Sequence, residues 1–113
     1  MKIFVAGAAG AVGARLVPLL VRAGHEVTAM TRTAAKADWA RRAGATHVAA
    51  DGLDRDAVLR AVAAARPDVI VHQMTALAGT QDLKNFDDDF AVTNRLRTEG
   101  SGTLLEAARD KGV

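Results

Sequence analysis

The chain has no cysteine and no tyrosine, and aromatic residues make up only 4% of its 113 residues. Without cysteine it has no disulfides and no thiolate metal sites. No stretch reaches the roughly 18 consecutive apolar residues of a transmembrane helix, and glycines and Arg15 interrupt the apolar amino terminus where a signal peptide would lie. We therefore expect a cytoplasmic protein that does not contact membranes.

The chain also lacks a large excess of one charge, because it has 15 basic and 13 acidic residues. The basic residues are scattered along the sequence. A nucleic-acid-binding surface needs a basic stripe or arm, so we expect no nucleic-acid partner. The hydrophobic half of the sequence is mostly Ala, Val, Leu and Ile, and the chain is long enough to bury a core of these residues. We expect residues 1–113 to form one domain.

Short strand-like runs alternate with helix-like stretches along the chain. The runs begin about twenty residues apart, which is typical of right-handed βαβ crossovers in a parallel sheet. This spacing predicts an α/β fold with a doubly wound parallel sheet, in which the first strand lies between the second and the fourth. The predicted strands span residues 3–6, 26–30, 46–50 and 69–72.

Apolar positions at helical spacing predict the helices. The first should span residues 11–23, where Val12, Leu16, Leu19, Leu20 and Ala23 recur at this spacing, although Pro18 inside it should produce a kink. A second should end at Gly44, and a third should run from Asp54, a plausible N-cap, to Arg66. After a loop at 75–81, the last should span about 86–111, with a weak or closely packed point at Gly100-Ser101-Gly102.

Three glycines follow the first predicted strand with the spacing Gly-x-x-Gly-x-x-Gly. The first permits a tight turn, the second lets a pyrophosphate approach the backbone, and the third lets the helix pack closely on the strand. Free N–H groups at the helix start would face the phosphates. The loop predicts a Rossmann-type dinucleotide site, and the lack of Gly-Lys-Ser/Thr excludes a P-loop. The expected pyrophosphate contacts are Gly7, Ala9, Gly10, Ala11, Val12 and Gly13.

Three stretches resemble the extended short-chain dehydrogenases/reductases of the NAD-dependent epimerase/dehydratase type. They are residues 1–13, Asp68-Val69-Ile70-Val71-His72, and Thr103-Leu104-Leu105-Glu106-Ala107-Ala108-Arg109 followed by Gly112-Val113. The likeness covers essentially the whole chain. It implies the amino-terminal part of a Rossmann NAD(P)-binding domain, truncated after about four βα units, without the fifth and sixth strands and the substrate domain.

The family's activity is hydride transfer between a nicotinamide and a sugar-like or carbonyl substrate. Its acid-base group is a tyrosine supported by a lysine four residues later, on the helix after the fifth strand. Because the chain has no tyrosine, we expect the 113-residue chain alone to be inactive. Two other functions remain open: a non-catalytic NADP(H)-sensing regulator, and a Rossmann scaffold used as an interaction module.

The residue after the second strand selects between NAD(H) and NADP(H). An NAD enzyme places a carboxylate there for the ribose 2′-hydroxyl. This chain has Thr31 and Arg32, with Lys36 close behind, and its first acid is Asp38. A guanidinium suits a 2′-phosphate, so we expect NADP(H) to be preferred, with NAD(H) as the alternative. Otherwise Arg32 is an ordinary solvated arginine.

The resemblance implies further site residues. Asp51 and Gly52 match the adenine contact, although Asp51 could equally be a turn residue. His72, Met74 and Thr75 match a strand-end motif near the nicotinamide ribose, where His72 does no acid-base chemistry and could simply be packed. Asn94 matches an asparagine that supports a proton-relay water, or else it faces solvent. The three acids at 87–89 point in different directions on a helix, so we assign no metal.

The fourth predicted strand would be central in a complete sheet but lies at an edge in this chain. Its Val-Ile-Val-His sequence has no lysine, proline or bulge to protect that edge. The last helix would also lose a neighbour, which should leave Leu104, Leu105 and Ala108 partly uncovered. We expect self-association through the strand or an exchanged last helix, or pairing with a missing carboxyl-terminal part.

Overall fold

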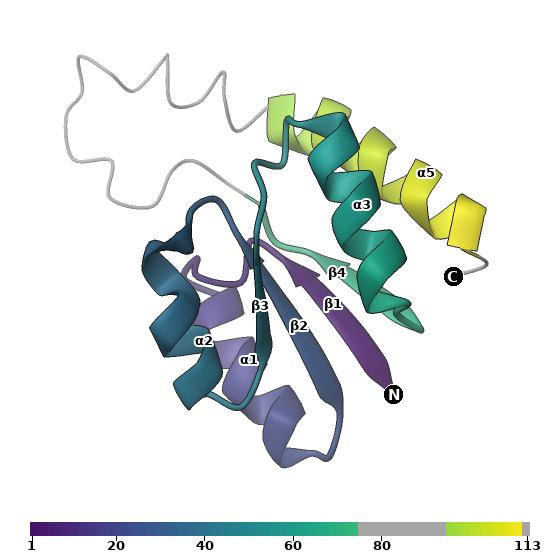
Figure 1. Ribbon diagram of the computed structural model, residues 1–113. Coiled ribbons are helices and arrows are strands. Elements are labelled where there is room, and N and C mark those ends of the chain that lie inside the picture. The colour runs from purple at the N-terminus through teal and green to yellow at the C-terminus, as the bar shows by residue number, and fades with distance from the viewer. Residues whose placement is uncertain (75–94, 112–113) are drawn as a thin grey trace, which may run out of the picture.

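A four-stranded parallel sheet forms the centre of the computed structural model, which describes residues 1–74 and 95–111. Its strand order, β3-β2-β1-β4, is the predicted one, so the expected α/β class and doubly wound arrangement are confirmed for this part of the chain (Figure 1). The strands are β1 (Lys2–Ala6), β2 (Glu26–Thr31), β3 (Thr46–Ala49) and β4 (Val69–His72).

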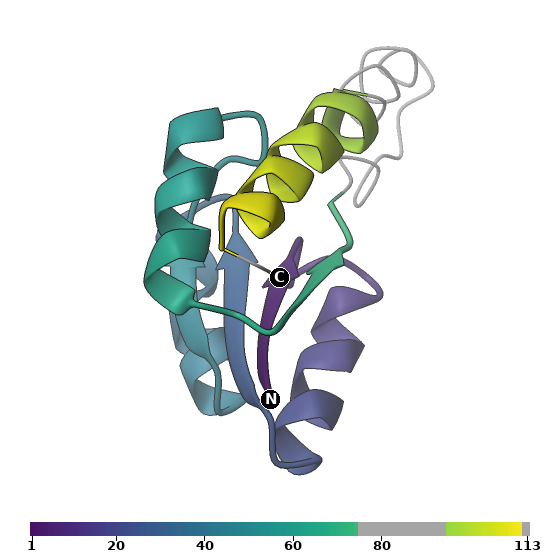
Figure 2. The same cartoon turned by 90° about the vertical axis from the view of Figure 1, so that its right-hand side faces the viewer.

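Helices cover both faces of the sheet, as the views in Figures 1 and 2 show for α1 and α3. One face carries α1 (Gly13–Arg22) and α2 (Ala37–Arg42), which a 3₁₀ turn (Ala34–Lys36) precedes. The other carries α3 (Arg55–Ala65) and α5 (Ser101–Lys111), and a π-helical turn (Leu96–Gly100) leads into α5.

The alternation of side chains across β1 divides the core in two. Phe4 and Ala6 pack toward α3 and α5, while Ile3 and Val5 pack toward α1 and α2. Because both faces of β1 are buried, every one of these residues is apolar. β4 is only partly buried along its length, since it pairs with β1 and with no other described strand.

The predicted helix signals are present. The Asp54 carboxylate accepts from the Ala57 N–H at 3.2 Å and caps α3. Gly24 and Gly44 follow α1 and α2 with φ of +91° and +89°, a conformation in which glycine ends a helix without strain. Gly100 permits close packing, because a Cβ there would lie 2.9 Å from the Met74 Cε.

Two predictions about helix faces are only partly correct. In α1, Gly13 and Val17 are buried and Leu20 packs against the same core as expected, whereas Val12 and Leu19 are 58% and 59% exposed. Because Gly13 packs closely against the Gly7–Ala8 backbone, the side of α1 that carries Gly13 and Val17 faces the core. In α5, Leu104 is buried under α3 rather than uncovered, and only Leu105 is largely exposed.

Candidate functional site at the carboxyl edge of the sheet

The carboxyl ends of the four parallel strands meet at one edge of the sheet. β1 leads into the glycine loop, β2 into the turn with Arg32, β3 into Asp51 and Gly52, and β4 ends at His72. The strand order reverses between β1 and β4, and ligands of doubly wound sheets bind outside the carboxyl ends at such a point. The predicted site residues that the structure describes therefore come together at one edge.

Two glycines of the loop are required by sterics. Gly7 has φ +80°, and a Cβ there would overlap the backbone of Gln73. A Cβ at Gly13 would lie 2.5 Å from the Gly7 carbonyl oxygen and 2.7 Å from that of Ala8. Gly10 differs, because the nearest atom to its Cβ would be 3.4 Å away. The protein thus fills the space beside Gly7 and Gly13, whereas a Cβ at Gly10 would make only ordinary van der Waals contacts.

Backbone N–H groups are available at the start of α1. The Gly7 and Ala8 N–H groups both donate to the Met30 carbonyl, which joins the loop to β2. Among the described residues, the N–H groups of Ala9, Ala11 and Val12 have no acceptor. Unpaired N–H groups at the positive end of a helix dipole form an anion-binding site.

The turn after β2 carries the positive charge of the site. Arg32 is 82% exposed, and its Nε lies 4.0 Å from the Asp51 carboxylate, which is itself 48% exposed. Asp51 also accepts from the Leu53 N–H, so it acts as a turn residue after β3. Asp38, the first acid after β2, pairs with Arg41 within α2 and not with the Arg32 turn.

His47 supports the Arg32 turn, and the sequence pattern did not reveal it. Its Nε2 lies 2.6 Å from the Thr31 hydroxyl, and that hydroxyl donates to the Thr33 carbonyl at 2.7 Å. Thr31 is only 5% exposed. The parallel pairing of β2 with β3 brings the two side chains together, because His47 lies opposite Ala29, two residues before Thr31.

Met74 joins the ends of β3 and β4. Its side chain is 7% exposed, and a Cβ on Gly52 would overlap its sulfur. The Met74 N–H donates to the His72 Nδ1 at 3.2 Å. The thioether therefore lies inside the core beneath the Asp51–Gly52 turn, and only the Met74 backbone belongs to the edge. Thr75 and Asn94 lie outside the described residues, as do the acids at 87–89.

Burial lowers the pKa of the His72 imidazole below its ordinary range. The positive charge of Arg97 lowers the pKa further, and a hydrogen bond with the Leu96 backbone opposes both effects. Because the Nδ1 accepts from Met74, the neutral form with hydrogen on Nε2 fits this environment.

We expect this shift to make stability depend on pH below neutrality. The unfolded chain's histidine has a pKa of about 6.5. The folded state binds fewer protons, so the contribution of neutral His72 is complete above this pH and declines as the pH falls toward the lower pKa of the folded state. Denaturant unfolding between pH 8 and 5 should show a smaller loss of stability for His72→Gln than for the wild type. Equal losses would contradict the assignment, since His25 and His47 are common to both proteins.

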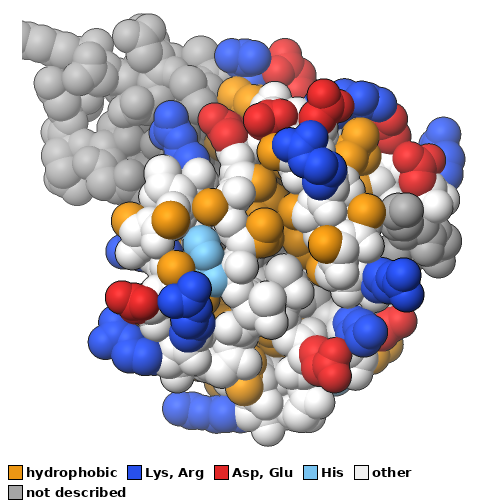
Figure 3. Space-filling model, viewed as in Figure 1, with side chains coloured by type: hydrophobic (Ala, Val, Ile, Leu, Met, Phe, Trp, Pro, Cys, Tyr) orange, Lys and Arg blue, Asp and Glu red, His pale blue; other side chains and the backbone are white. Residues whose placement is uncertain are grey.

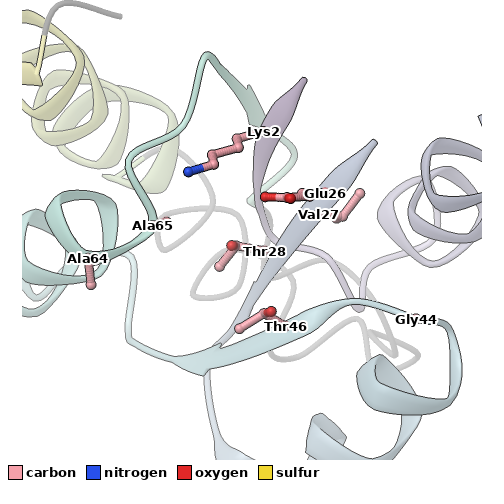
Figure 4. Close-up of a pocket in the computed structure, with 8 residues that line it drawn as sticks. All are labelled: Lys2, Glu26, Val27, Thr28, Gly44, Thr46, Ala64 and Ala65. Atoms are coloured by element: carbon pink, nitrogen blue, oxygen red, sulfur yellow. The ribbon is translucent and has the colours of Figure 1, made fainter. Parts of the chain in front are cut away.

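A pocket of about 320 Å³ opens at the opposite, amino-terminal edge of the sheet. Lys2, Glu26 and Thr46 are the first residues of three strands, and they line it together with the end of α3 (Figure 4). Its position is wrong for a cofactor of a doubly wound sheet, which binds at the carboxyl edge. We therefore assign the dinucleotide to the glycine-loop edge.

Basic and acidic side chains are interspersed on the face that Figure 3 shows, so its described residues give a nucleic-acid backbone no continuous basic path. Within residues 1–74 and 95–111, no three metal-ligating side chains form a group. The same residues contain no helix long and apolar enough to cross a membrane.

The model of the NAD dependent epimerase/dehydratase family matches residues 3–113. The chain belongs to this family. A 3-diazoavenalumate denitrifying reductase of Streptomyces sp is 51% identical over 113 residues, which cover the whole chain and 35% of that reductase. The predicted resemblance is thus confirmed, and this chain spans about a third of the length of that relative.

Solved structures of similar fold contain NAD. The enzyme WbmG of Bordetella bronchiseptica, in complex with NAD and UDP, has a TM-score of 0.77 at 27% identity. The UDP-glucose 4-epimerase of Thermus thermophilus, in complex with NAD, has a TM-score of 0.77 at 28% identity. Each match covers 100% of this chain and 35% of the other.

Proposed function

We propose that residues 1–113 form part of the dinucleotide-binding domain of a cytoplasmic NADP(H)-dependent reductase that acts on a small carbonyl or sugar-like molecule. The observation that carries the proposal is the occurrence, at one sheet edge, of a glycine loop that has unpaired N–H groups and an exposed Arg32 in the turn after β2, where an NAD enzyme places a carboxylate. The glycine loop supports the binding of a dinucleotide, and Arg32 supports NADP(H), the form that carries a 2′-phosphate.

The pyrophosphate lies against the loop in this proposal. The N–H groups of Ala9, Ala11 and Val12 donate to its oxygens, and the lack of a side chain at Gly10 lets it approach the backbone. Asp51 and Gly52 then flank the adenine. His72, the Met74 backbone and Thr75 lie at the nicotinamide ribose, and Asn94 holds a water for proton relay.

The 2′-phosphate is bound by Arg32, with Lys36 nearby on the 3₁₀ turn. The Arg32–Asp51 pair is long and solvent-exposed, and such pairs contribute only about 0–1 kcal/mol. A charge-assisted hydrogen bond to a phosphate contributes about 1.5–3 kcal/mol, so the phosphate outcompetes the carboxylate for the guanidinium.

A reductase activity, rather than an epimerase activity, fits both the proposed preference for NADPH and the name of the relative at 51% identity. An epimerase returns its hydride to the substrate and leaves the cofactor unchanged, whereas a reductase consumes a reduced cofactor in each turnover. The relative at 51% identity is named a reductase, while the epimerase at 28% identity binds NAD. Arg32, which favours NADPH, supports the reductase on independent grounds.

Titration of NADPH and NADH against wild type and Arg32→Asp tests the proposal. The wild type should bind NADPH about 10- to 150-fold more tightly than NADH, the value of one charge-assisted hydrogen bond. Arg32→Asp should lose this preference, because an acid there repels the phosphate and accepts from the 2′-hydroxyl.

A charge-matched control is Arg22→Asp, which makes the same change of charge in the last turn of α1, at the other edge of the sheet. It should retain the NADPH preference. A wild type that prefers NADH, or an Arg32→Asp variant that still prefers NADPH, would show that the 2′-phosphate assignment is wrong.

A further inference from the structure

The backbone between Thr31 and Thr33 determines where Arg32 points. The Arg32 side chain is 82% exposed and touches Asp51 only at 4.0 Å, so the side-chain contacts of Arg32 hold it weakly. Interactions that hold the Thr31–Thr33 turn therefore determine the position from which the Arg32 guanidinium reaches a ligand.

Side-chain hydrogen bonds close this turn. The Thr31 hydroxyl donates to the Thr33 carbonyl, and the Thr33 hydroxyl accepts from the Ala35 N–H at the start of the 3₁₀ turn. The Thr31 carbonyl accepts from the Ala50 N–H at 2.9 Å, which anchors the start of the turn to the end of β3.

The direction of these bonds determines the role of His47. A hydroxyl has one hydrogen to donate, and the Thr31 hydrogen goes to Thr33. The hydroxyl must then accept at the 2.6 Å contact with His47, so His47 carries a hydrogen on Nε2. Donation from the imidazole polarises the hydroxyl and strengthens its own donation to the Thr33 carbonyl.

We infer that His47 is a positioning residue for cofactor selection: its Nε2–H, through the buried Thr31 hydroxyl, holds the Thr31–Thr33 turn in the conformation that presents Arg32 to the cofactor. The inference rests on the proposed binding of the 2′-phosphate by Arg32. His47 itself touches no part of the dinucleotide, and its effect is limited to the ribose end that distinguishes NADPH from NADH.

The test compares variants that differ in one donor. His47→Phe keeps an aromatic ring and removes the Nε2–H, whereas the His47→Gln amide can still donate. Titrations of the purified chain should show a preference for NADPH over NADH that is about 3- to 10-fold smaller in His47→Phe, the effect of one neutral hydrogen bond. The NADH dissociation constant should stay near that of the wild type. His47→Gln should keep most of the preference.

A second pair of variants keeps the test valid if His47→Phe folds poorly. Thr31→Val removes the hydroxyl at nearly constant volume and should give the same loss, while Thr31→Ser should retain the preference. Long-range ¹H–¹⁵N spectra of the wild-type imidazole should place the hydrogen on Nε2 of His47.

The outcomes separate the two proposals. A wild type that prefers NADH overturns the proposed function and, with it, the role of His47. A wild type that prefers NADPH, together with a His47→Phe or Thr31→Val variant that keeps the full preference, overturns the inference alone. An unprotonated Nε2 in the spectra also overturns it.

Discussion

Gly13→Ala should lower the free energy of unfolding by on the order of 3 kcal/mol, the upper end of the cost of overpacking a core. For a domain of this size, the melting temperature should fall by about 10 °C. The added methyl would lie 2.5 Å from the Gly7 carbonyl oxygen, 2.7 Å from the Ala8 carbonyl oxygen and 2.8 Å from the Ala8 Cα. All three are backbone atoms, so no side chain can rotate to make room.

Gly10→Ala should have the opposite profile. Its methyl would meet no described atom closer than 3.4 Å, so the fold should tolerate it. The same methyl would occupy the space that the pyrophosphate needs, and we expect NADPH binding to weaken about tenfold or more. We therefore expect the two glycines to differ, with Gly13 required for packing and Gly10 for the approach of the ligand.

Thermal unfolding and NADPH titration of both variants separate these roles. Gly102→Ala is the matched control, because a Cβ there meets nothing within 4 Å and alanine favours a helix by up to about 1 kcal/mol over glycine. Equal melting temperatures for Gly13→Ala and Gly102→Ala would refute the packing role. Unchanged NADPH affinity in Gly10→Ala would refute the position of the pyrophosphate.

The strands were predictable because their signal is local. Residues 3–6 and 69–71 are continuous apolar runs, one directly before Gly7 and one shortly after Pro67, and strands of a parallel sheet covered on both faces have such sequences. The positions of the glycine loop and of Arg32 at one edge followed from the alternation of strands and helices, since the carboxyl ends of parallel strands must meet.

Helix faces were not predictable to the same degree. α1 has apolar residues on more than one side, and a line through Val12 and Leu19 looks as hydrophobic in sequence as the buried line through Gly13 and Val17. The close contact of Gly13 with the loop decides between the two lines, and helical periodicity carries no information about that contact. Leu104 was misplaced for the same reason, because its burial depends on packing against α3.

The sequence pattern does not reveal the contact of His47 with Thr31, because that contact depends on strand register. A single histidine in a short strand has no partner at a recognisable spacing. Only the pairing of Ala29 with His47 places the imidazole beside Thr31. The contact can be predicted only once the register of β2 against β3 is known.

The 113-residue chain should self-associate through the free edge of β4. Among the described strands, β4 pairs only with β1, in a register that sets Val69 opposite Ile3 and Val71 opposite Val5. No described strand pairs with its other edge, and its side chains are only partly buried. An unprotected, apolar edge of this kind is a template for another strand.

β3 lies at the other edge of the sheet and provides the comparison. It is equally short, but its end residues Thr46 and Ala49 are exposed and its sequence is more polar. We therefore expect association at β4 rather than at β3. Val69→Lys and Thr46→Lys place the same charge on the first residue of each edge strand. Val69 also packs against the core cluster, whereas Thr46 is exposed, so the comparison requires that Val69→Lys remains folded.

Sedimentation velocity at micromolar concentrations, with circular dichroism to verify folding, decides the matter. The wild type and Thr46→Lys should sediment as dimers or larger species whose population grows with concentration, and Val69→Lys should shift toward the monomer. Exchange of α5 between two chains is the competing route, and in that case Val69→Lys would leave the association intact. A wild type that stays monomeric throughout would show that the β4 edge does not recruit another strand.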